Sequence, residues 1–370
     1  MRRLTRLTSI AIALTLPVVA LTCTPLAAAG ALQQEPSVRQ PVLQPETLDS
    51  LRSKITNLVS QPAYESAQWG IKVISLDTGR TLFEQKPNAY YNPASNAKLF
   101  TAALALTRLG PDFRIKTSLY STAPPDSGVI KGDLIVYGRG DPTFAARLND
   151  GDYYRALEPL AAVLASAGIK KIDGDLVGDE SYFRGPPFGS GWEWDNLQWY
   201  YGAEVSALTV NDNSVDLFVK PGDRAGLPCR ISTGPAVSNL TIINRTQTGA
   251  KGSECRISVY RPVGENTVYI SGCIALGSDG FTGFVAVHNP ANLFASLFRE
   301  VLERRGIAVT GKTRTFDWKY REIVPLDPKK LTDLGSVDSL PIKDIVRETL
   351  KPSQNLYAQL LLLQAGANAV

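Results

Sequence analysis

Hydrophobic positions follow two different periods along the chain. They recur at helical spacing in residues 47–60, and again from the stretch "NPASNAKLFTAALALTRLG", which ends at Gly110. From about Lys116, short alternating stretches such as "GDLIVYGRGDPTF" and "TVYISGCIAL" predict strands between Gly and Asp turns. Helical spacing returns near Pro325 in "SLPIKDIVRETLKPSQNLYAQLLLLQAG". The pattern therefore predicts an α/β (α+β) chain in which a strand-rich segment separates two helical pieces of one domain.

This change of pattern sets the expected domain limits. We expect residues 47–116 and 325–370 to form one discontinuous domain, and residues 117–324 to form a β-rich insert of two subdomains. An insert of roughly 200 residues is long enough for one or two compact domains.

The first residues carry a different pattern again. Three arginines precede an apolar core over residues 10–21, and three alanines ending at Ala29 follow it. This order of basic, apolar and small residues predicts a signal peptide over residues 1–29, followed by a flexible leader over residues 30–46. The alternative is a membrane anchor, which a short apolar core interrupted by Pro17 disfavours. We therefore expect an exported protein of the periplasm or cell envelope.

Export permits disulfides, and the expected mature chain carries three cysteines. Cys229, Cys255 and Cys273 all fall in one strand-rich stretch. An odd number allows at most one intrachain bridge and leaves one thiol over. The pattern does not identify the pair, and small buried residues without a bridge are an equal alternative.

Composition narrows the functional classes. Hydrophobic residues make up 44% of the chain and charged residues 20%, as in soluble globular proteins. The 39 basic and 35 acidic residues nearly balance, so nucleic-acid binding is not expected. The single histidine, His288, ends an apolar strand, where we expect a packed structural role. A Ser-His-Asp triad or a histidine-based metal site is therefore disfavoured.

Ser95 and Lys98 stand three residues apart where the first long helix begins. Residues at this spacing share one helix face, about 5–6 Å apart at Cβ. A serine becomes nucleophilic only when a base takes its proton, and burial can lower a lysine pKa enough for that role. The apolar residues expected to bury this turn are Leu99, Phe100, Ala102 and Ala103. Taken alone, the pattern favours an ordinary helix cap at Ser95.

A second motif, Ser353-Gln354-Asn355, lies between two predicted helices. Alternate residues of an extended loop can point the same way, so a hydroxyl could pass a proton to a leaving amine while an amide holds a substrate carbonyl. The alternative is a helix N-cap at Ser353. The two motifs together, one on each side of the predicted insert, predict an acyl-transfer site more strongly than either does alone.

With both motifs in place, the sequence resembles the penicillin-binding D-alanyl-D-alanine carboxypeptidase/endopeptidase family of the class C low-molecular-mass type, which has a large insert between them. The resemblance covers residues 47–370. The stretches that carry it are "NPASNAKLFTAALALTRLG", "SYFRGPPFGSGWEWDNLQWYYGAEVSALTVNDN" and "KPSQNLYAQLL". The family more often has Asp at the position of Gln354 and Glu at that of Gln359. The resemblance implies a penicillin-binding serine transpeptidase-like domain.

The resemblance also implies a role for each residue of the two motifs. Ser95 would be the acylated nucleophile, Lys98 its base, Ser353 a proton carrier and Asn355 a binder of the substrate backbone. The implied substrates are peptidoglycan peptides ending in D-Ala-D-Ala, with β-lactams as covalent inhibitors. No cofactor is implied, because the Ser/Lys mechanism needs none.

In this family an acidic residue and a nearby aromatic residue of the insert help to bind the peptidoglycan side chain. Asp179 and Phe183 are the candidates, and a turn followed by a core aromatic residue is an equal alternative. We interpret "GDPT" at residues 140–143 as a structural turn.

The resemblance breaks at the family's third motif, Lys-Thr/Ser-Gly, which occurs nowhere in the chain. The stretch Lys312-Thr313-Arg314 lacks the glycine and precedes the second motif. The site would lose a partner for the substrate carboxylate and one oxyanion donor, and such a loss costs on the order of 10²–10³ in rate. We therefore expect a domain incomplete at its C-terminus, with apolar surface such as "LYAQLLLLQ" exposed.

Three functions follow from these residues. The first is a serine-type D-Ala-D-Ala carboxypeptidase, with endopeptidase activity on cross-links left open. The second is an impaired, truncated member that retains at most peptidoglycan or β-lactam binding, with the peptidoglycan contact made through the insert. For the protein in general, a peripheral contact with the membrane or the cell wall is a further expectation. The third is a β-lactamase, which the large insert disfavours, together with the lack of a Glu on an obvious water-activating loop.

Overall fold

The computed structural model describes residues 47–236 and 240–368. The predicted signal peptide and leader lie outside the described residues. The chain divides into two compact units, with the boundary between Tyr91 and Asn92. In the described ranges, no helix combines the length and the apolar character needed to cross a membrane.

The first unit contains one helix and a two-stranded hairpin. Thr47 caps α1 (Leu48–Val59) because its side chain accepts the N–H of Ser50. β1 (Ile71–Ile74) and β2 (Thr81–Gln85) pair antiparallel around the Asp-Thr-Gly turn, which confirms the two predicted strands. No described residue of this unit is fully buried, so its elements enclose no core among themselves.

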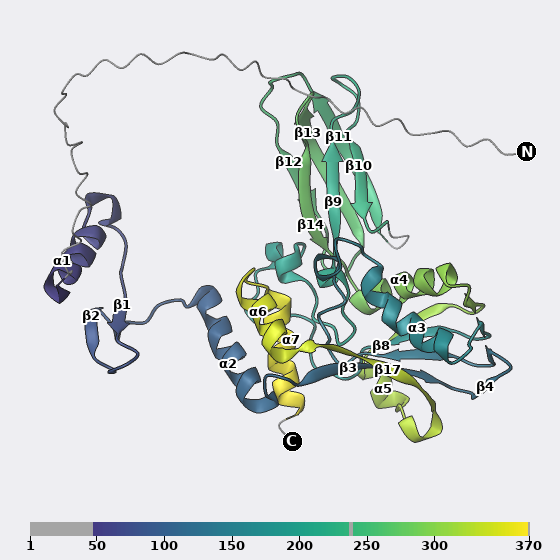
Figure 1. The fold of residues 1–370 in the computed structure, drawn as a ribbon. Helices are drawn as coiled ribbons and strands as arrows, with labels where there is room; N and C mark the ends of the chain where they lie inside the picture. The colour runs from purple at the N-terminus through teal and green to yellow at the C-terminus, as the bar shows by residue number, and fades with distance from the viewer. Residues whose placement is uncertain (1–46, 237–239, 369–370) are drawn as a thin grey trace, which may run out of the picture. The chain divides into compact units, whose positions relative to one another are not determined.

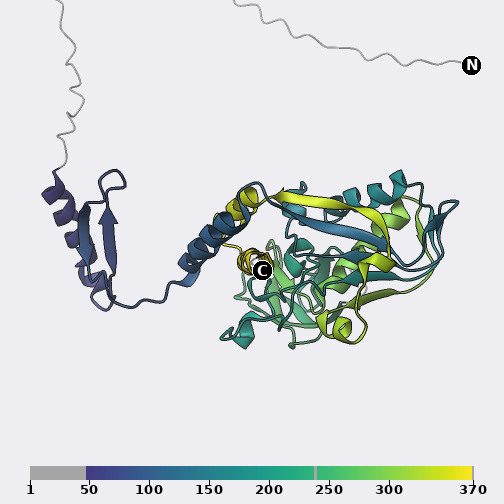
Figure 2. The ribbon, with the colours of Figure 1, turned by 90° about the horizontal axis from the view of Figure 1, so that it is seen from below.

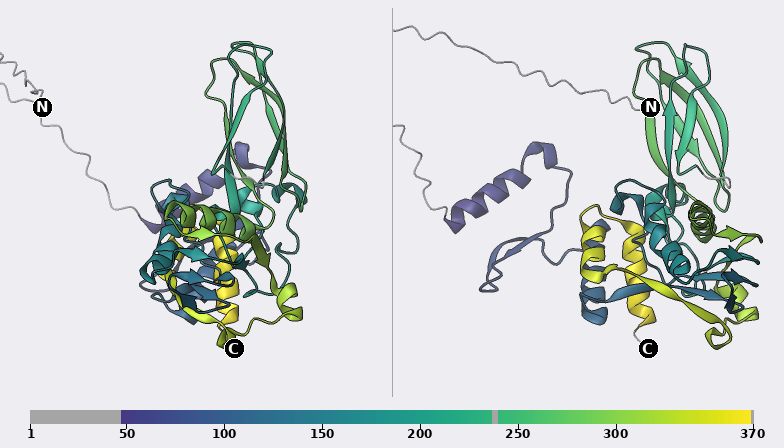
Figure 3. Two further views of the ribbon diagram at one scale, coloured as in Figure 1. Left: turned by 90° about the vertical axis from the view of Figure 1, so that its right-hand side faces the viewer. Right: turned by 45° about the vertical axis from the view of Figure 1, so that its right-hand side comes forward.

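Three helices of the second unit pack together and carry the two motifs at their ends. They are α2 (Ala97–Leu109), α6 (Ile342–Leu350) and α7 (Asn355–Ala367). Figures 1 and 3 show the three helices side by side. Their shared core is apolar and includes Ala102, Ala105, Ile345, Leu356, Tyr357 and Leu360. The predicted helices at both motifs are confirmed.

A five-stranded mixed sheet, in the order β16-β8-β6-β3-β17, forms the framework of the second unit. Two helices, α3 (Glu158–Ser166) and α4 (Pro290–Arg304), pack against this sheet and against each other. Its strands are β3 (Arg114–Ser121), β6 (Leu134–Tyr137), β8 (Leu176–Asp179), β16 (Thr313–Phe316) and β17 (Thr332–Pro341).

The pairing of β3 with β17 joins segments that are far apart in the sequence (Figure 2). Lys116 lies opposite Asp338, and beyond the pair the N–H of Ile342 donates to the Phe113 carbonyl at 2.9 Å. Because α2 ends just before β3 and α6 begins just after β17, this pairing places α2 beside α6. The predicted domain limits stay a prediction. β17 lies outside the predicted insert, residues 117–324, yet it forms the edge strand of the sheet to which most of the insert's longer strands in this region belong.

In the described part of the second unit, three further sheets and a short helix, α5 (Trp318–Ile323), complete the fold. One sheet has the order β15-β7-β5-β4, and two have the orders β10-β9-β14 and β11-β13-β12. Figure 1 shows the last two sheets lying together. The strands are β4 (Pro125–Asp126), β5 (Val129–Ile130), β7 (Lys171–Ile172), β9 (Ser214–Lys220), β10 (Arg230–Gly234), β11 (Thr241–Gly249), β12 (Ile257–Tyr260), β13 (Thr267–Ala275), β14 (Phe281–Ala286) and β15 (Ala308–Val309).

One disulfide crosses the sheet that contains β12 and β13. Cys255, just before β12, is bonded to Cys273 of β13. Cys229 is buried and its thiol is free. The expectation of at most one bridge is confirmed, and the alternative of three unbridged cysteines is wrong.

The "GDPT" stretch forms the structural turn that the sequence predicts. Gly140 has a φ of 86°, and its N–H donates to the Ala207 carbonyl at 2.6 Å. Asp141 is 2% exposed, and its Oδ1 accepts the N–H of Thr143 at 2.8 Å and the Thr143 hydroxyl at 2.6 Å. Burial raises the pKa of Asp141 to about 7, because it outweighs these two hydrogen bonds.

Asp141 should make the stability of the fold depend on pH. Its folded pKa lies above the unfolded value of about 3.9, so its stabilising contribution is complete below about pH 4 and is lost as the pH rises toward 7. Asp141→Asn keeps an acceptor for Thr143. Between about pH 4.5 and about pH 7.5, the free energy of unfolding of Asp141→Asn should therefore fall by roughly 3 kcal/mol less than that of the unaltered protein. Urea unfolding of both proteins measures this difference, and parallel falls would contradict it.

Candidate functional site

Three side chains from the two motifs form a closed triangle of hydrogen bonds. Lys98 Nζ donates to Ser95 Oγ at 2.9 Å and to Ser353 Oγ at 3.3 Å. The Ser353 hydroxyl donates to Ser95 Oγ at 2.9 Å. The structure thus brings together the residues that the sequence pairs, and we call Ser95, Lys98 and Ser353 the Ser–Lys–Ser cluster.

The start of α2 places Ser95 at the surface and Lys98 beneath it. Ser95 lies in a short 3-10 turn, Ala94–Asn96, that runs directly into α2. Ala94 has a φ of 43°, and its N–H donates to Asn92 Oδ1 at 3.0 Å, which fixes the entry to the turn. Ser95 is exposed, whereas Lys98 is only 8% exposed. The nucleophile candidate is therefore accessible, and its candidate base is not.

The loop between α6 and α7 carries Ser353 in an uncommon backbone conformation. Ser353 has a φ of 61°, in the left-handed region that non-glycine residues rarely occupy. Its N–H donates to the Leu350 carbonyl at 3.3 Å, and the N–H of Gln354 donates to the Thr349 carbonyl at 2.8 Å. Such conformations cost about 1–3 kcal/mol and persist where the surroundings fix them, commonly at functional sites.

The environment of Lys98 favours its neutral form. Burial lowers the pKa of the Lys98 amine below its ordinary value. Both of its hydrogen-bond partners are hydroxyl oxygens, and among the described residues no carboxylate pairs with it. A carboxylate neighbour would favour the ammonium form. Because the described surroundings contain none, burial is the dominant influence on the pKa of Lys98.

Asn355 begins α7 and is fixed by a segment far away in the sequence. Its Nδ2 donates to the Tyr201 carbonyl at 2.8 Å. Tyr201 follows Tyr200 in the aromatic stretch that carries part of the family resemblance. No sequence signal singled out Tyr201, because the contact uses only its backbone oxygen.

Asp179, predicted to bind substrate, lies at the end of β8 with no exposed surface. Its carboxylate pairs with Arg321 of α5, with the Nη2–Oδ2 atoms 2.6 Å apart, and it accepts the N–H of Ser181 at 3.1 Å. This position fits the alternative interpretation, a turn, better than it fits substrate binding. The role of Asp179 in binding stays a prediction, and the sequence pattern did not indicate Arg321.

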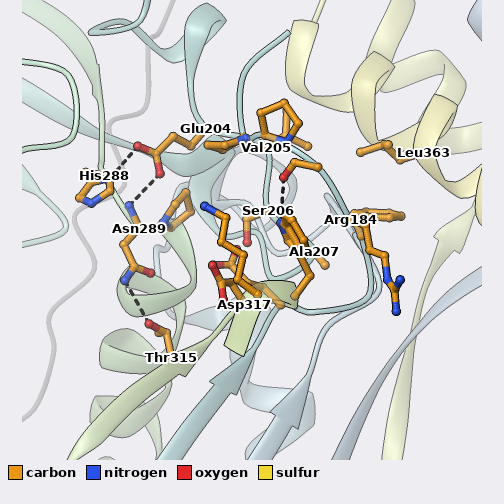
Figure 4. Close-up of a pocket in the computed structure, with 18 residues that line it drawn as sticks. Arg184, Glu204, Val205, Ser206, Ala207, His288, Asn289, Thr315, Asp317 and Leu363 are labelled. Carbon is orange, nitrogen blue, oxygen red and sulfur yellow. Dashed lines mark hydrogen bonds and ion pairs between the residues drawn. The ribbon is translucent and has the colours of Figure 1, made fainter. Parts of the chain in front are cut away.

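Phe183, the second predicted binding residue, is half-buried and lines a pocket of about 580 Å³. Figure 4 shows Glu204, His288 and Asn289 on one side of this pocket, and Arg184 and Leu363 of α7 on the other. None of the Ser–Lys–Ser cluster lines the pocket. The binding role of Phe183 likewise stays a prediction.

Two acidic groups line the same pocket, half-buried Glu180 and buried Glu204. Burial raises the pKa of Glu180 to about 7, and the nearby charges of Glu204, Asp317 and Asp179 act in the same direction. Glu204 accepts a hydrogen bond from the N–H of Asn289 at 2.9 Å and contacts His288 Nδ1 at 2.8 Å (Figure 4). The sequence pattern did not identify Glu180 or Glu204.

His288 is less enclosed than expected, because 46% of its side chain is exposed. The expectation of a packed residue is wrong on this point, although the residue does serve a structural contact with Glu204. In residues 47–236 and 240–368, no group of three or more His, Cys, Asp or Glu side chains is placed to hold a metal ion.

Two expectations about apolar residues near the cluster are wrong: that "LYAQLLLLQ" is exposed, and that Leu99 and Phe100 are buried. Most of "LYAQLLLLQ" is buried in the helix core, and Leu362, at 45%, is its exposed large apolar residue. Of the residues expected to bury the turn at Lys98, Leu99 is 56% exposed and Phe100 78% exposed. Packing of α2 on α6 and α7 turns Ala102 inward and turns these larger side chains outward.

Comparison with known proteins identifies the family and the fold of the chain. The chain matches the D-Ala-D-Ala carboxypeptidase 3 (S13) family over residues 51–369. It is 31% identical over 325 residues to a D-alanyl-D-alanine carboxypeptidase of Actinomadura sp. (strain R39), which covers 86% of this chain and 58% of that protein. The crystal structure of penicillin binding protein 4 (dacB) from Haemophilus influenzae has a TM-score of 0.66 at 25% identity, covering 81% of this chain and 62% of that one.

A second crystal structure of the Haemophilus influenzae protein, in complex with a β-lactam, has a TM-score of 0.62 at 24% identity and covers 83% of this chain and 62% of that one. The fold is thus the mixed α/β fold of a penicillin-binding protein. The chain belongs to the D-Ala-D-Ala carboxypeptidase 3 (S13) family, which confirms the resemblance. It spans about three fifths of the length of these relatives.

The buried pair of Asp179 and Arg321 should contribute to stability. Arg321→Met would leave a carboxylate buried without its partner, which should lower the free energy of unfolding by roughly 3 kcal/mol. Arg314→Met is the matched control, because Arg314 pairs with Asp175 from a side chain that is 55% exposed, and its loss should cost about 1 kcal/mol or less. Urea unfolding measures both changes. Equal losses would contradict a structural role for the Asp179 pair.

Lys98 should reduce stability at neutral pH. Because its folded pKa lies below that of an unfolded lysine, the buried ammonium destabilises the fold at pH 7, and this penalty disappears as the pH rises toward about 10. Lys98→Met should therefore unfold at a higher urea concentration than the unaltered protein at pH 7, with the difference narrowing at alkaline pH. Lys98→Arg, which keeps a charge throughout this range, should show no such gain. A Lys98→Met protein that is less stable at pH 7 would refute the prediction.

Proposed function

We propose that this chain carries the acylation site of a serine-type D-alanyl-D-alanine carboxypeptidase that acts on peptidoglycan peptides. The observation that carries the proposal is the Ser–Lys–Ser cluster, in which a buried lysine contacts an exposed serine hydroxyl at 2.9 Å. Family membership and the printed activity of the Actinomadura relative support it. Whether the protein also cleaves cross-links as an endopeptidase is left to experiment.

In the proposed acylation step, neutral Lys98 takes the proton from Ser95 as its Oγ attacks the carbonyl carbon between the two D-Ala residues. The lowered pKa of Lys98 supports this role, because only the unprotonated amine can accept a proton. The proton then passes through the Ser353 hydroxyl to the departing nitrogen. The C–N bond breaks, free D-alanine leaves and an ester remains on Ser95.

The proposed deacylation reverses the same proton path. Water attacks the ester carbonyl and gives a proton to the Ser353–Lys98 pair, and Ser95 Oγ regains a proton as the acyl bond breaks. Ser95 lies in the 3-10 turn that leads into α2, where backbone N–H groups lack intrahelical acceptors, so its N–H would stabilise the oxyanion formed in each step. Asn355, held by Tyr201, would orient the substrate backbone.

Further elements of the proposal come from the sequence and from the relatives. The basic, apolar and small N-terminal pattern supports export to the periplasm or cell envelope, where the proposed substrate occurs. The Haemophilus influenzae protein has been crystallised with a β-lactam, which supports covalent inhibition of this chain by β-lactams at Ser95. Phe183, which lines the pocket, is proposed as a contact to the peptidoglycan side chain, and Asp179, buried in its pair with Arg321, as a residue that positions the segment carrying Phe183.

The test is covalent labelling of the purified chain with radiolabelled penicillin. Labelling should be found on Ser95, should disappear in Ser95→Ala and should slow by about 100-fold or more in Lys98→Met, because general-base assistance is worth about 10²–10⁴ in rate. Release of D-alanine from a D-Ala-D-Ala peptide should likewise be lost in Ser95→Ala and be slowed in Lys98→Met. Ser66→Ala, which alters an exposed serine of the first unit, is the control that should label normally. A folded chain that takes no label would refute the proposal.

A further inference from the structure

Arg147 contacts three separate segments that meet near the loop of Ser353. Its Nη1 pairs with Glu348 Oε2, near the end of α6, at 2.7 Å. Its Nε pairs with Asp212 Oδ2, in the segment before β9, at 3.2 Å. The guanidinium also lies over the ring of Tyr357, in the first turn of α7, with Cζ 4.7 Å from the ring centroid. One side chain therefore joins the two helices on either side of the Ser353 loop to the strand-rich segment, and we call these contacts the Arg147 junction.

The partners in the Arg147 junction are largely shielded from water. The side chains of Asp212 and Glu348 are 16% and 19% exposed. Tyr357 is fully buried, and its hydroxyl donates to the Pro142 carbonyl at 2.7 Å, which fixes the ring. Partly buried ion pairs are screened less than exposed pairs, and a planar guanidinium can bridge two carboxylates while it stacks on a ring. The junction therefore fixes how α6 and α7 lie against the segment of Asp212.

The turn that presents Asp212 to Arg147 is itself held in an uncommon conformation. Residues 211–213 have φ values of 47°, 55° and 54°, all in the left-handed region. Asn211 Oδ1 accepts the N–H of Ala146 at 2.8 Å, which ties this turn to the residue before Arg147. Non-glycine residues keep such conformations only where surrounding contacts fix them, commonly near functional sites. The position of the Asp212 carboxylate is therefore set by its own backbone.

The loop between α6 and α7 depends on where these two helices end and begin. It holds Ser353 at a φ of 61°, and the N–H groups of Ser353 and Gln354 donate to the Leu350 and Thr349 carbonyls of α6. A shift at the end of α6 would therefore move the Ser353 hydroxyl with it. In the described part of the chain, Arg147 bonds to no member of the Ser–Lys–Ser cluster, so its influence on the cluster passes through the two helices.

We propose that Arg147 is a positioning residue for the Ser353 hydroxyl. By holding Glu348 and Tyr357 together, Arg147 fixes the ends of α6 and α7. The loop between them then keeps Ser353 Oγ within 2.9 Å of Ser95 Oγ. This inference rests on the proposed function, in which Ser353 passes the proton during acylation. Loss of the junction should slow that proton transfer without weakening the reversible encounter that precedes it, because a displacement of about 1 Å can cost about 100-fold in rate.

The first test is the rate of penicillin labelling of Arg147→Met as a function of penicillin concentration, which separates reversible binding from acylation. The acylation rate constant should fall by about 10- to 100-fold, and the reversible dissociation constant should stay within about twofold. Arg147→Lys should recover little of the rate, because an ammonium cannot bridge two carboxylates and stack on a ring as a guanidinium does. Arg155→Met is the matched control that should label normally, because Arg155 forms an exposed pair with Asp150 in the same part of the chain.

Hydrogen exchange tests the Arg147 junction without acyl transfer. In Arg147→Met, the amides of residues 349–354 should exchange about tenfold faster, which corresponds to a lost coupling of about 1.4 kcal/mol. The amides of α2 should stay within about twofold of the unaltered protein. Glu348→Gln should speed exchange in the same segment and add little to Arg147→Met in the double variant, because both changes remove one contact. It also provides a second variant if Arg147→Met does not fold.

Three results would overturn the inference. One is an acylation rate constant in Arg147→Met equal to that in Arg155→Met. Another is exchange that rises equally in α2 and in residues 349–354, which would show a general loss of stability. The third is weaker reversible binding with an unchanged acylation rate constant. An unaltered chain that takes no label would refute the proposed function instead, and exchange in residues 349–354 would then decide the inference.

Discussion

The candidate site depends on the antiparallel pairing of β3 with β17. This pairing brings together the two ends of a chain segment that holds most of the strands, and it continues into the N–H of Ile342 bonded to Phe113. α2 precedes β3 and α6 follows β17, so the pairing of the two strands brings the two helices close together. This pairing places the end of α2 beside the start of α6, and the packing of both helices with α7 then brings the hydroxyls of Ser95 and Ser353 within 2.9 Å.

Burial within this frame lowers the pKa of Lys98. Lys98 is buried between two hydroxyl groups, and neither of them carries a charge that would hold its proton. We expect this arrangement to reduce stability at neutral pH, and in the proposed mechanism it provides the base. Sites of this kind show that function and stability place different demands on the same side chain.

Local spacing predicted part of this arrangement and could not predict the rest. The contact between Ser95 and Lys98 follows from the geometry of one helix turn, and the loop position of Ser353 follows from the helical pattern on both sides. In contrast, the partners of Asp179 and Asn355 lie on other elements, Arg321 and the backbone of Tyr201. No periodicity within one segment encodes a contact that tertiary packing creates. The exposure of Phe100 was mispredicted for the same reason, because hydrophobic character alone does not say which face of α2 meets α6 and α7.

The loop that carries Ser353 holds this side chain in an uncommon backbone conformation. Ser353 has a φ of 61°, and the N–H groups of Ser353 and Gln354 donate to the carbonyls of Leu350 and Thr349 at the end of α6. Gln354 is buried beside it. A conformation of this kind persists only where its surroundings fix it, so the position of the Ser353 hydroxyl depends on the packing of the two helices that the loop joins.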